Sequence, residues 1–161
     1  MKQSVYWVID GAQEAQAVLE KARKAFDADA PEAVLCRFSE EMPAAAKKEF
    51  LNAVRPYFQD KGVAFILRDN ASLLKGCDGL HVSFSKDLAA LRKKCGDLSL
   101  GVTCATRHEA MIAGEKGADY VAFAGENAAG LASWWADLFV VPCAVLSDEP
   151  CGAADFVMKP L

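Results

Sequence analysis

Eight short apolar runs recur along this chain and constrain its fold more than any other feature. Each is nearly continuous in Val, Ile, Leu, Phe and Ala. The runs are Val5–Ile9, Ala33–Phe38, Val63–Arg68, Gly79–Phe84, Leu98–Cys104, Asp119–Ala124, Phe139–Leu146 and Asp155–Met158. Continuous apolar runs of this length are typical of parallel strands that are buried on both faces. The runs therefore predict a parallel sheet with helices packed against it.

Helical patterns lie between these runs, with apolar residues spaced three or four positions apart on one face. Their apolar faces contain Ala15, Val18, Leu19, Ala22 and Phe26 in the first, Phe50, Val54, Tyr57 and Phe58 in the second, Leu88, Leu91 and Cys95 in the fourth, Ala110, Ile112 and Ala113 in the fifth, and Leu131, Trp135 and Leu138 in the sixth. Pro56 is expected to kink or split the second helix, because proline lacks the backbone N–H. Alternating strands and helices predict right-handed βαβ units.

One phrase is repeated three times, at Lys75–Val82, Lys116–Phe123 and Cys151–Val157. Each copy has a glycine that can end a helix, a small residue, an Asp and then a strand. We expect the Asp to bind local backbone as the strand begins. The copies precede the fourth, sixth and eighth strands, which favours a closed (β/α)8 TIM-type barrel over an open doubly wound sheet.

The predicted barrel is a small single domain over residues 1–161. The connections after the third and seventh strands, Asp69–Cys77 and Ser147–Ala154, are too short for full helices, and no C-terminal helix follows the eighth strand. This leaves a sector of the barrel without cover near Trp134 and Trp135. Exposed apolar surface usually finds a partner, so we expect self-association there, as a homodimer or another oligomer.

The composition excludes several classes of protein. A net charge of −4 argues against nucleic acid as a partner. No apolar run is long enough to cross a membrane, and the N-terminus lacks the pattern of a signal peptide. The six cysteines are Cys36, Cys77, Cys95, Cys104, Cys143 and Cys151. Because no pair has the spacing of a zinc site or a CxxC motif, we expect reduced thiols in a cytoplasmic protein.

Polar side chains at the ends of the strands are the candidates for a site, since barrels carry their sites at the C-terminal ends of strands. The cations there are Arg37, Arg68, Lys86 and Lys159, and together they could bind an anion such as phosphate. Asp69 and Asp87 could ligate Mg²⁺. The alternative for Asp69 is an ion pair with Arg37 or Arg68.

Two further polar residues have alternative interpretations. His81 lies inside a strand, where a hydrogen-bonded core residue is the more usual role than a base. Thr103 ends the fifth strand and could contact a ligand.

The chain resembles the thiamine phosphate synthase and TenI family of small (β/α)8 barrels, from about Val5 to Val157. Gly62–Asp69 and Cys77–Val82 resemble the family's "GVPLIIND" and "ADGVHLGQ(E/D)D". Gly101–Thr106 resembles "GVSTHS", and Gly117–Val121 resembles "GADYVGVGP". The order and spacing of the motifs match as well as their composition.

The resemblance implies roles for several residues. Arg37 matches the family's arginine that contacts the pyrimidine diphosphate substrate, whereas Ser39 stands where that motif has a lysine. Asp69 matches a metal-ligating aspartate, and Thr103 replaces a serine near the pyrimidine. Arg68 stands where the family has a substrate-binding asparagine.

The resemblance is less complete in other loops. Lys86 stands at the second metal-ligating aspartate, with Asp87 one residue later. The loop Gly125–Gly130 lacks the threonine and lysine of the family's "PTxTK". Ala144–Glu149 lacks the paired glycines of "AIGGI". Because Mg²⁺ and lysine stabilise the leaving pyrophosphate in the family's reaction, these differences predict that the reaction is impaired or lost.

The sequence therefore favours a divergent member of this family that binds a small phosphorylated or anionic metabolite. Its predicted binding residues are Arg37, Ser39, Arg68, Asp69, His81, Lys86 and Thr103. One alternative is an active transferase that joins pyrimidine diphosphate and thiazole phosphate, with Mg²⁺ on Asp69 and Asp87. Another is a TenI-like isomerase, for which His81 is the available base. A third is a non-catalytic partner protein.

Overall fold

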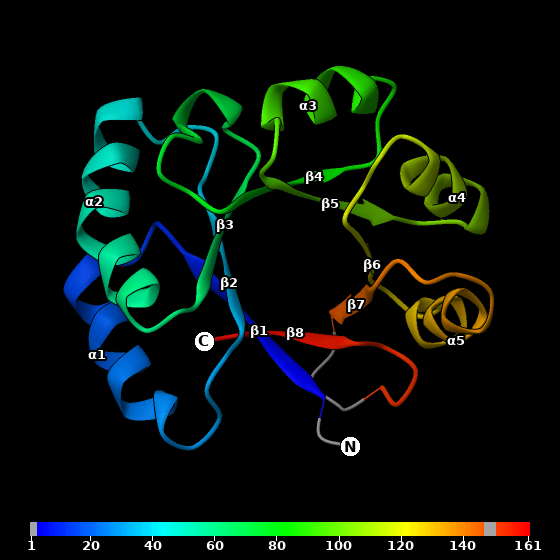
Figure 1. Ribbon diagram of the computed structural model, residues 1–161. Helices are drawn as coiled ribbons and strands as arrows, with labels where there is room; N and C mark the ends of the chain where they lie inside the picture. The colour runs from blue at the N-terminus through cyan, green and yellow to red at the C-terminus, as the bar shows by residue number, and fades with distance from the viewer. Residues whose placement is uncertain (1–2, 147–150) are drawn as a thin grey trace.

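In the computed structural model, which describes residues 3–146 and 151–161, parallel strands close into a barrel (Figure 1). The order around the barrel is the order along the chain, and β8 pairs with β1. The strands are β1 Ser4–Asp10, β2 Ala33–Arg37, β3 Ala64–Arg68, β4 Gly79–Ser83, β5 Ser99–Cys104, β6 Tyr120–Phe123, β7 Cys143–Leu146 and β8 Phe156–Pro160. The predicted (β/α)8-type barrel is therefore confirmed.

Helices flank the barrel at the left, top and right of Figure 1. Within the described residues they are α1 Ala15–Phe26, α2 Ala44–Asp60, α3 Leu88–Cys95, α4 Arg107–Glu115 and α5 Ala128–Leu138. The connection after β3 holds only a 3-10 turn, Ala71–Leu73, as its length predicts. The second short connection includes residues 147–150, which lie outside the described residues. Over the described range, no helix follows β8.

Two apolar clusters explain why the strands are apolar on both faces. The inner cluster fills the barrel and contains Tyr6, Leu35, Ile66, Ala122, Ala144 and Met158. The outer cluster lies between the strands and the helices; for example, Trp7 of β1 meets Phe26 of α1 and Phe58 of α2 edge to face. Alternate residues of a strand such as β1 therefore belong to different clusters, Tyr6 to the inner and Trp7 to the outer, which explains the nearly continuous apolar runs.

Strand β7 starts later than predicted, at Cys143 instead of Phe139. Phe139 stacks on Trp135 of α5, with their ring centroids 4.1 Å apart, and the Trp135 indole donates a hydrogen bond to the Val141 carbonyl. Pro142 precedes the strand and has no N–H for a sheet ladder. Phe139 and the Val141 carbonyl therefore contact the helix instead of extending the sheet.

Pro56 does not split the second helix, since α2 is one helix from Ala44 to Asp60. Pro56 and Asn52, whose carbonyl loses its usual partner, are both exposed. Water can satisfy that carbonyl, and the buried stripe of Phe50, Val54 and Phe58 holds the helix against the barrel.

The three repeated phrases share one cross-strand contact. In each, the Asp before an even-numbered strand binds one residue of the preceding strand twice: its N–H donates to that residue's carbonyl, and its carboxylate accepts from that residue's N–H. The pairs are Asp78 with Phe65, Asp119 with Leu100 and Asp155 with Cys143, and the carboxylate bonds measure 2.7, 2.7 and 2.9 Å. The Asp therefore joins neighbouring strands, whereas the sequence suggested a bond to local backbone.

Arg92 of α3 reinforces the middle copy of this contact. Its guanidinium donates to the Asp119 carboxylate at 2.7 Å and to the carbonyls of Gly117, Gly96 and Leu98. The Arg92 side chain therefore connects α3 by hydrogen bonds to the residues that precede β5 and β6.

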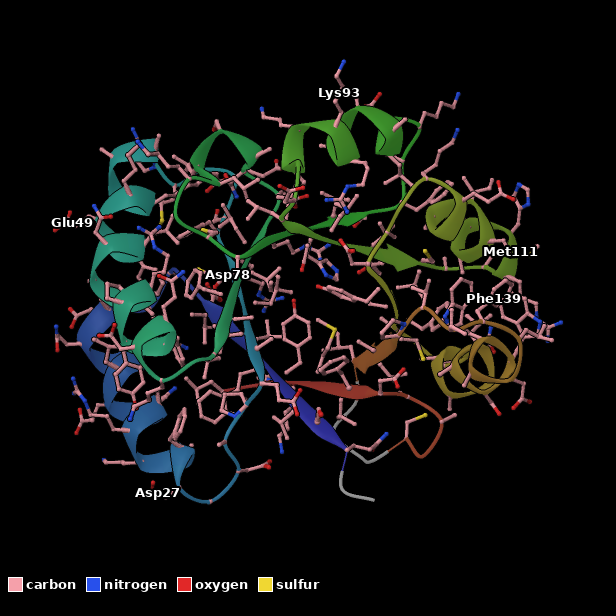
Figure 2. The ribbon with its side chains drawn as sticks, in the orientation of Figure 1. Asp27, Glu49, Asp78, Lys93, Met111 and Phe139 are labelled. Atoms are coloured by element: carbon pink, nitrogen blue, oxygen red, sulfur yellow. The ribbon has the colours of Figure 1, made fainter. Side chains whose placement is uncertain are left out.

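We expect Arg92→Met to lower the free energy of unfolding by about 1.5 kcal/mol, because hydrogen bonds to a charged group contribute about 1.5–3 kcal/mol and Asp119 is half exposed. Urea denaturation measures the change. Lys93→Met is the matched control, because Lys93 lies on the same helix and points away from the barrel (Figure 2). Equal stability of the two variants would contradict this role of Arg92.

The sector of the barrel that was predicted to lack cover is less exposed than expected. Val5 and Val157 on its outer side are buried, and so is Trp135. Large exposed apolar side chains lie instead at Leu138 and Val140, and self-association stays a prediction. In the part of the chain that the structure describes, no helix is long and apolar enough to cross a membrane.

Candidate functional site

A cavity of about 540 Å³ opens at the carboxyl ends of the strands. Most of its lining is apolar, and its polar side chains are Arg37, Arg68 and Thr103. The lining residues are Val8, Leu35, Arg37, Arg68, Thr103, Ala122, Phe123, Ala124, Leu146, Met158 and Pro160. A small ligand with an apolar ring and a negative charge fits this combination.

Two arginines come from neighbouring strands at the same level of the barrel. Arg37 ends β2 and Arg68 ends β3, and the residues before them, Cys36 and Leu67, are paired in the sheet. Arg37 is exposed, and no described residue forms a hydrogen bond or an ion pair with its side chain. Its five N–H donors are therefore available to an anion.

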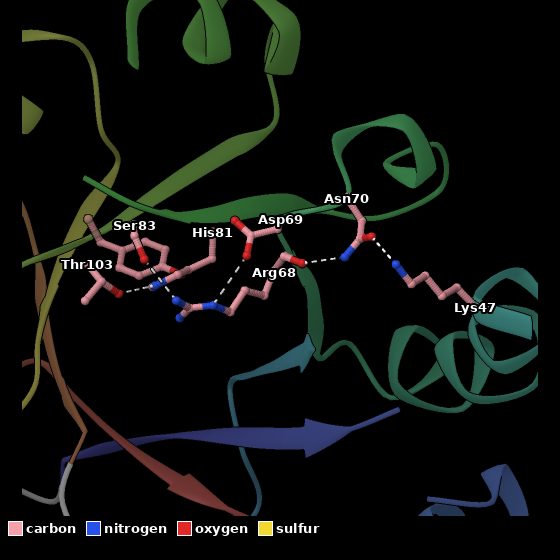
Figure 3. A network of polar contacts seen from close by, with 8 residues as sticks. Lys47, Arg68, Asp69, Asn70, His81, Ser83 and Thr103 are labelled. Atoms are coloured by element: carbon pink, nitrogen blue, oxygen red, sulfur yellow. Dashed lines mark hydrogen bonds and ion pairs between the residues drawn. The ribbon is translucent and has the colours of Figure 1, made fainter. Parts of the chain in front are cut away.

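Arg68 is partly held by its neighbours. Its Nη2 donates to the Ser83 hydroxyl at 3.0 Å, and its Nε lies 3.7 Å from the Asp69 carboxylate (Figure 3). This confirms the predicted ion pair of Asp69 with Arg68. The guanidinium side chain remains one-third exposed, so it is both oriented and accessible.

The end of β3 is a strained turn. Asp69 and Asn70 both have left-handed backbone, with φ of 53° and 54°. Asn70 donates to the Arg68 carbonyl, and its side-chain oxygen accepts a hydrogen bond of 2.8 Å from Lys47 of α2 (Figure 3). Lys47 is only 8% exposed. Backbone strain of this kind persists only where the surroundings enforce it, and it is common at functional sites.

We expect Lys47→Met to loosen this turn while it preserves most of the packing of α2. Loss of one hydrogen bond of about 1 kcal/mol should raise the hydrogen-exchange rate of amides around Asn70 about fivefold. Exchange measured by mass spectrometry tests this, with the exposed neighbour variant Lys48→Met as the control. If exchange near Asn70 is the same in both variants, Lys47 does not hold the turn.

His81 lies behind the cavity wall. It is fully buried, with Nε2 2.6 Å from the Thr103 hydroxyl and Nδ1 2.6 Å from the Tyr120 hydroxyl. Burial, and then the charge of Arg68, lowers the pKa of His81 to about 3. His81 is therefore neutral at physiological pH and contacts Thr103 instead of the cavity itself. This placement matches the hydrogen-bonded core role.

The remaining predicted residues lie away from the cavity lining. Ser39 and Lys86 are exposed in loops after β2 and β4. Lys159 points outward from β8 and pairs with Asp29 at 2.5 Å. Lys47, Asn70, Tyr6 and Tyr120 are site residues that were not predicted from the sequence. The signal for Lys47 was available, because it begins the buried stripe of α2.

The family pattern implies Mg²⁺, and the described residues do not fit such a site. The carboxylate of Asp69 is 63% exposed and lies beside the Arg68 guanidinium. Asp87 is exposed at the start of α3, and neither aspartate lines the cavity. The fixed positive charge of Arg68 beside Asp69 disfavours the binding of Mg²⁺ there, so no chemical step is assigned to a metal.

Comparison with known proteins places the chain in a family. A family model described as thiamine monophosphate synthase (TMP-TENI) matches residues 5–126. The thiamine-phosphate synthase of Rhodospirillum centenum is 35% identical in an alignment 159 residues long. The alignment covers 88% of this chain and 76% of the relative. The thiamine-phosphate synthase of Erythrobacter litoralis is 36% identical over 102 residues, which cover 52% of this chain and 48% of the relative.

Solved structures support the fold. The thiamine phosphate pyrophosphorylase of Pyrococcus furiosus superposes with a TM-score of 0.80 at 17% identity, over 98% of this chain and 85% of the other. Tryptophan synthase of M. tuberculosis superposes with a TM-score of 0.72 at 14% identity, over 99% and 83%. At these identities the superpositions establish the barrel alone. By the family match and the identity to the Rhodospirillum protein, the chain belongs to the thiamine monophosphate synthase and TenI family.

Proposed function

We propose that this chain binds a small phosphorylated or anionic metabolite in the strand-end cavity, and that the synthase reaction of its family is impaired or lost. The observation that carries the proposal is the pair Arg37 and Arg68 at the edge of an otherwise apolar cavity. Arginine binds phosphate through two parallel hydrogen bonds, which gives both affinity and orientation.

The rest of the cavity suits an uncharged ring. Leu35, Leu146 and Met158 provide apolar walls, and a cavity of about 540 Å³ lies within the range of small-molecule sites. The pyrimidine and thiazole phosphates handled by the family have this composition, an aromatic ring joined to phosphate.

The synthase reaction places stronger demands on the site than binding does. Pyrophosphate must leave from the pyrimidine, and its developing charge needs several stabilising groups. Here Arg68 replaces an asparagine, Lys86 replaces a metal-ligating aspartate, and Gly125–Gly130 has neither lysine nor threonine. The family loop after β7 falls on residues that include 147–150, which lie outside the described residues.

A second candidate function is an active, Mg²⁺-dependent synthase with Asp69 and Asp87 as metal ligands. The observation in its favour is the 35% identity to a relative named thiamine-phosphate synthase. Formation of thiamine phosphate that requires Mg²⁺ and is abolished in Asp69→Ala would favour this candidate over ours.

A screen of thermal stability against thiazole and pyrimidine phosphates tests the proposed binding. At a ligand concentration a hundred times the Kd, the folded state gains about 2.7 kcal/mol, which raises the Tm by several degrees. We expect such a rise with at least one of the phosphates and none with the matching alcohols. No rise with any phosphate, in a folded protein, would refute the proposal.

A cytoplasmic location is part of the same proposal. All six cysteines lie in the described residues as free thiols, and five of them are buried. Burial raises the pKa of Cys36, Cys104 and Cys143, which keeps these thiols protonated and unreactive. Free thiols in this number are typical of a reducing compartment.

A further inference from the structure

A line of four hydrogen-bonding side chains runs through the barrel to the cavity. The hydroxyls of Tyr6 and Tyr120 are 2.6 Å apart, Tyr120 is 2.6 Å from His81 Nδ1, and His81 Nε2 is 2.6 Å from Thr103. The residues come from β1, β6, β4 and β5. Only Thr103 lines the cavity.

The protons of this line can be arranged in two ways, because His81 is neutral and carries one ring proton. In the first, Tyr6 donates to Tyr120, Tyr120 to Nδ1, and Nε2–H to Thr103. In the second, Thr103 donates to Nε2, Nδ1–H to Tyr120, and Tyr120 to Tyr6.

The far end of the line decides between the two arrangements. Tyr6 is 2% exposed, and among the described residues its hydroxyl has one hydrogen-bond partner, Tyr120. In the second arrangement Tyr6 must accept from Tyr120, so its own buried proton has no acceptor. In the first arrangement every buried proton has one. An unsatisfied buried donor is costly, so the first arrangement is favoured.

We propose that this line orients its protons toward the cavity, so that His81 is the Nε2–H tautomer and the Thr103 hydroxyl donates to an acceptor atom of the bound ligand. Tyr6, Tyr120 and His81 are then positioning residues for Thr103. The part that concerns the ligand rests on the proposed function, whereas the tautomer does not.

Local packing keeps the line in place. A side-chain carbon added at Gly101 of β5 would lie 2.0 Å from the Tyr120 ring, so the glycine is what lets this ring lie across the strand. The Tyr120 ring also packs against the rings of Tyr6 and His81, with centroids 5.9 and 5.5 Å away. Free rotation of these hydroxyl-bearing rings is therefore restricted.

The ligand atom at Thr103 follows from its neighbours. Arg68 reaches across to Ser83, and Ser83 is the partner of Thr103 in the sheet register (Figure 3). An anion bound to Arg68 therefore lies next to Thr103, where an anionic oxygen can accept its proton. A ligand group that can only donate would leave this proton without a partner, so the line selects for acceptors at this position.

Nitrogen NMR of the histidine rings tests the tautomer directly, since the chain has only two histidines and His108→Gln identifies the His81 signals. We expect the proton of His81 on Nε2 and an unprotonated Nδ1 throughout pH 5–9. Tyr6→Phe should keep this state, because Tyr120 must still donate to Nδ1. A proton on Nδ1, a mixture of tautomers, or a changed tautomer in Tyr6→Phe would overturn the proposal.

Calorimetry with inorganic pyrophosphate as the probe tests the role of Thr103. We expect Thr103→Val to weaken binding about tenfold, and Thr103→Ser, which retains the hydroxyl, to stay within about twofold of the original chain. Equal binding by the valine variant would overturn the donor role. If the original chain binds neither pyrophosphate nor the thiazole and pyrimidine phosphates, the proposed function fails, and the NMR result still decides the tautomer.

Discussion

Replacing Arg68 by methionine is expected to weaken the binding of pyrimidine and thiazole phosphates about ten- to a hundredfold. Arg68 is oriented by Ser83 and Asp69, and it faces the cavity with one-third of its side chain exposed. Hydrogen bonds to a charged group contribute about 1.5–3 kcal/mol, and each 1.4 kcal/mol changes a Kd about tenfold. Methionine keeps the length of the side chain and removes its charge.

Isothermal titration calorimetry measures this loss, with Arg23→Met as the control. Arg23 is exposed on α1 and does not line the cavity. Its replacement by methionine changes the net charge by the same amount as Arg68→Met. A loss of affinity that is equal in both variants would mean that general electrostatics, and not the contact with Arg68, attracts the ligand. Arg37→Met should resemble Arg68→Met, since Arg37 lines the same cavity.

The second large effect concerns turnover. Given pyrimidine diphosphate, thiazole phosphate and saturating Mg²⁺, we expect this chain to form thiamine phosphate at least about 10⁴-fold more slowly than the Rhodospirillum relative. Removal of one group that stabilises developing charge costs about 10²–10³ in rate, and several such groups differ here. Arg68 and Lys86 also place positive charge where the family pattern has asparagine and a metal-ligating aspartate.

The double variant Arg68→Asn with Lys86→Asp sharpens this second prediction. If the two cations are responsible for the loss, the variant should recover some Mg²⁺-dependent turnover, and Lys93→Met in the same assay should recover none. Turnover of the unaltered chain within tenfold of the relative would refute the proposed impairment.

Much of the fold could be predicted because it depends on pattern. Buried parallel strands need apolar residues on both faces, and Val63–Arg68 and Gly79–Phe84 lie within one residue of β3 and β4 at each end. The late start of β7 could be predicted only in part, because Pro142 marks it in the sequence, whereas the stacking of Phe139 on Trp135 exists only in the folded chain. The paired backbone contacts of Asp78, Asp119 and Asp155 likewise involve strands that only the folded barrel brings together.

The site could be predicted in part. Side chains alternate between the inside and the outside of the barrel along each strand, and this alternation separates the residues that line the cavity from those that do not. Arg37, Arg68 and Thr103 lie at inward positions of their strands and line the cavity. Lys159 is one residue from the inward Met158, so it points outward to Asp29. The partners of Lys47 and Tyr6, Asn70 and Tyr120, lie more than twenty residues away, so the buried stripe of α2 could mark Lys47 as buried without revealing its contact.

We infer that this cavity binds a phosphorylated ligand through arginine, without a metal. Calorimetric titration of a pyrimidine phosphate in a chelator, and again in Mg²⁺, tests it most directly. We predict binding in the chelator with a Kd within about threefold of that in Mg²⁺. Binding that appears only with Mg²⁺, or that is absent under both conditions, would contradict the claim.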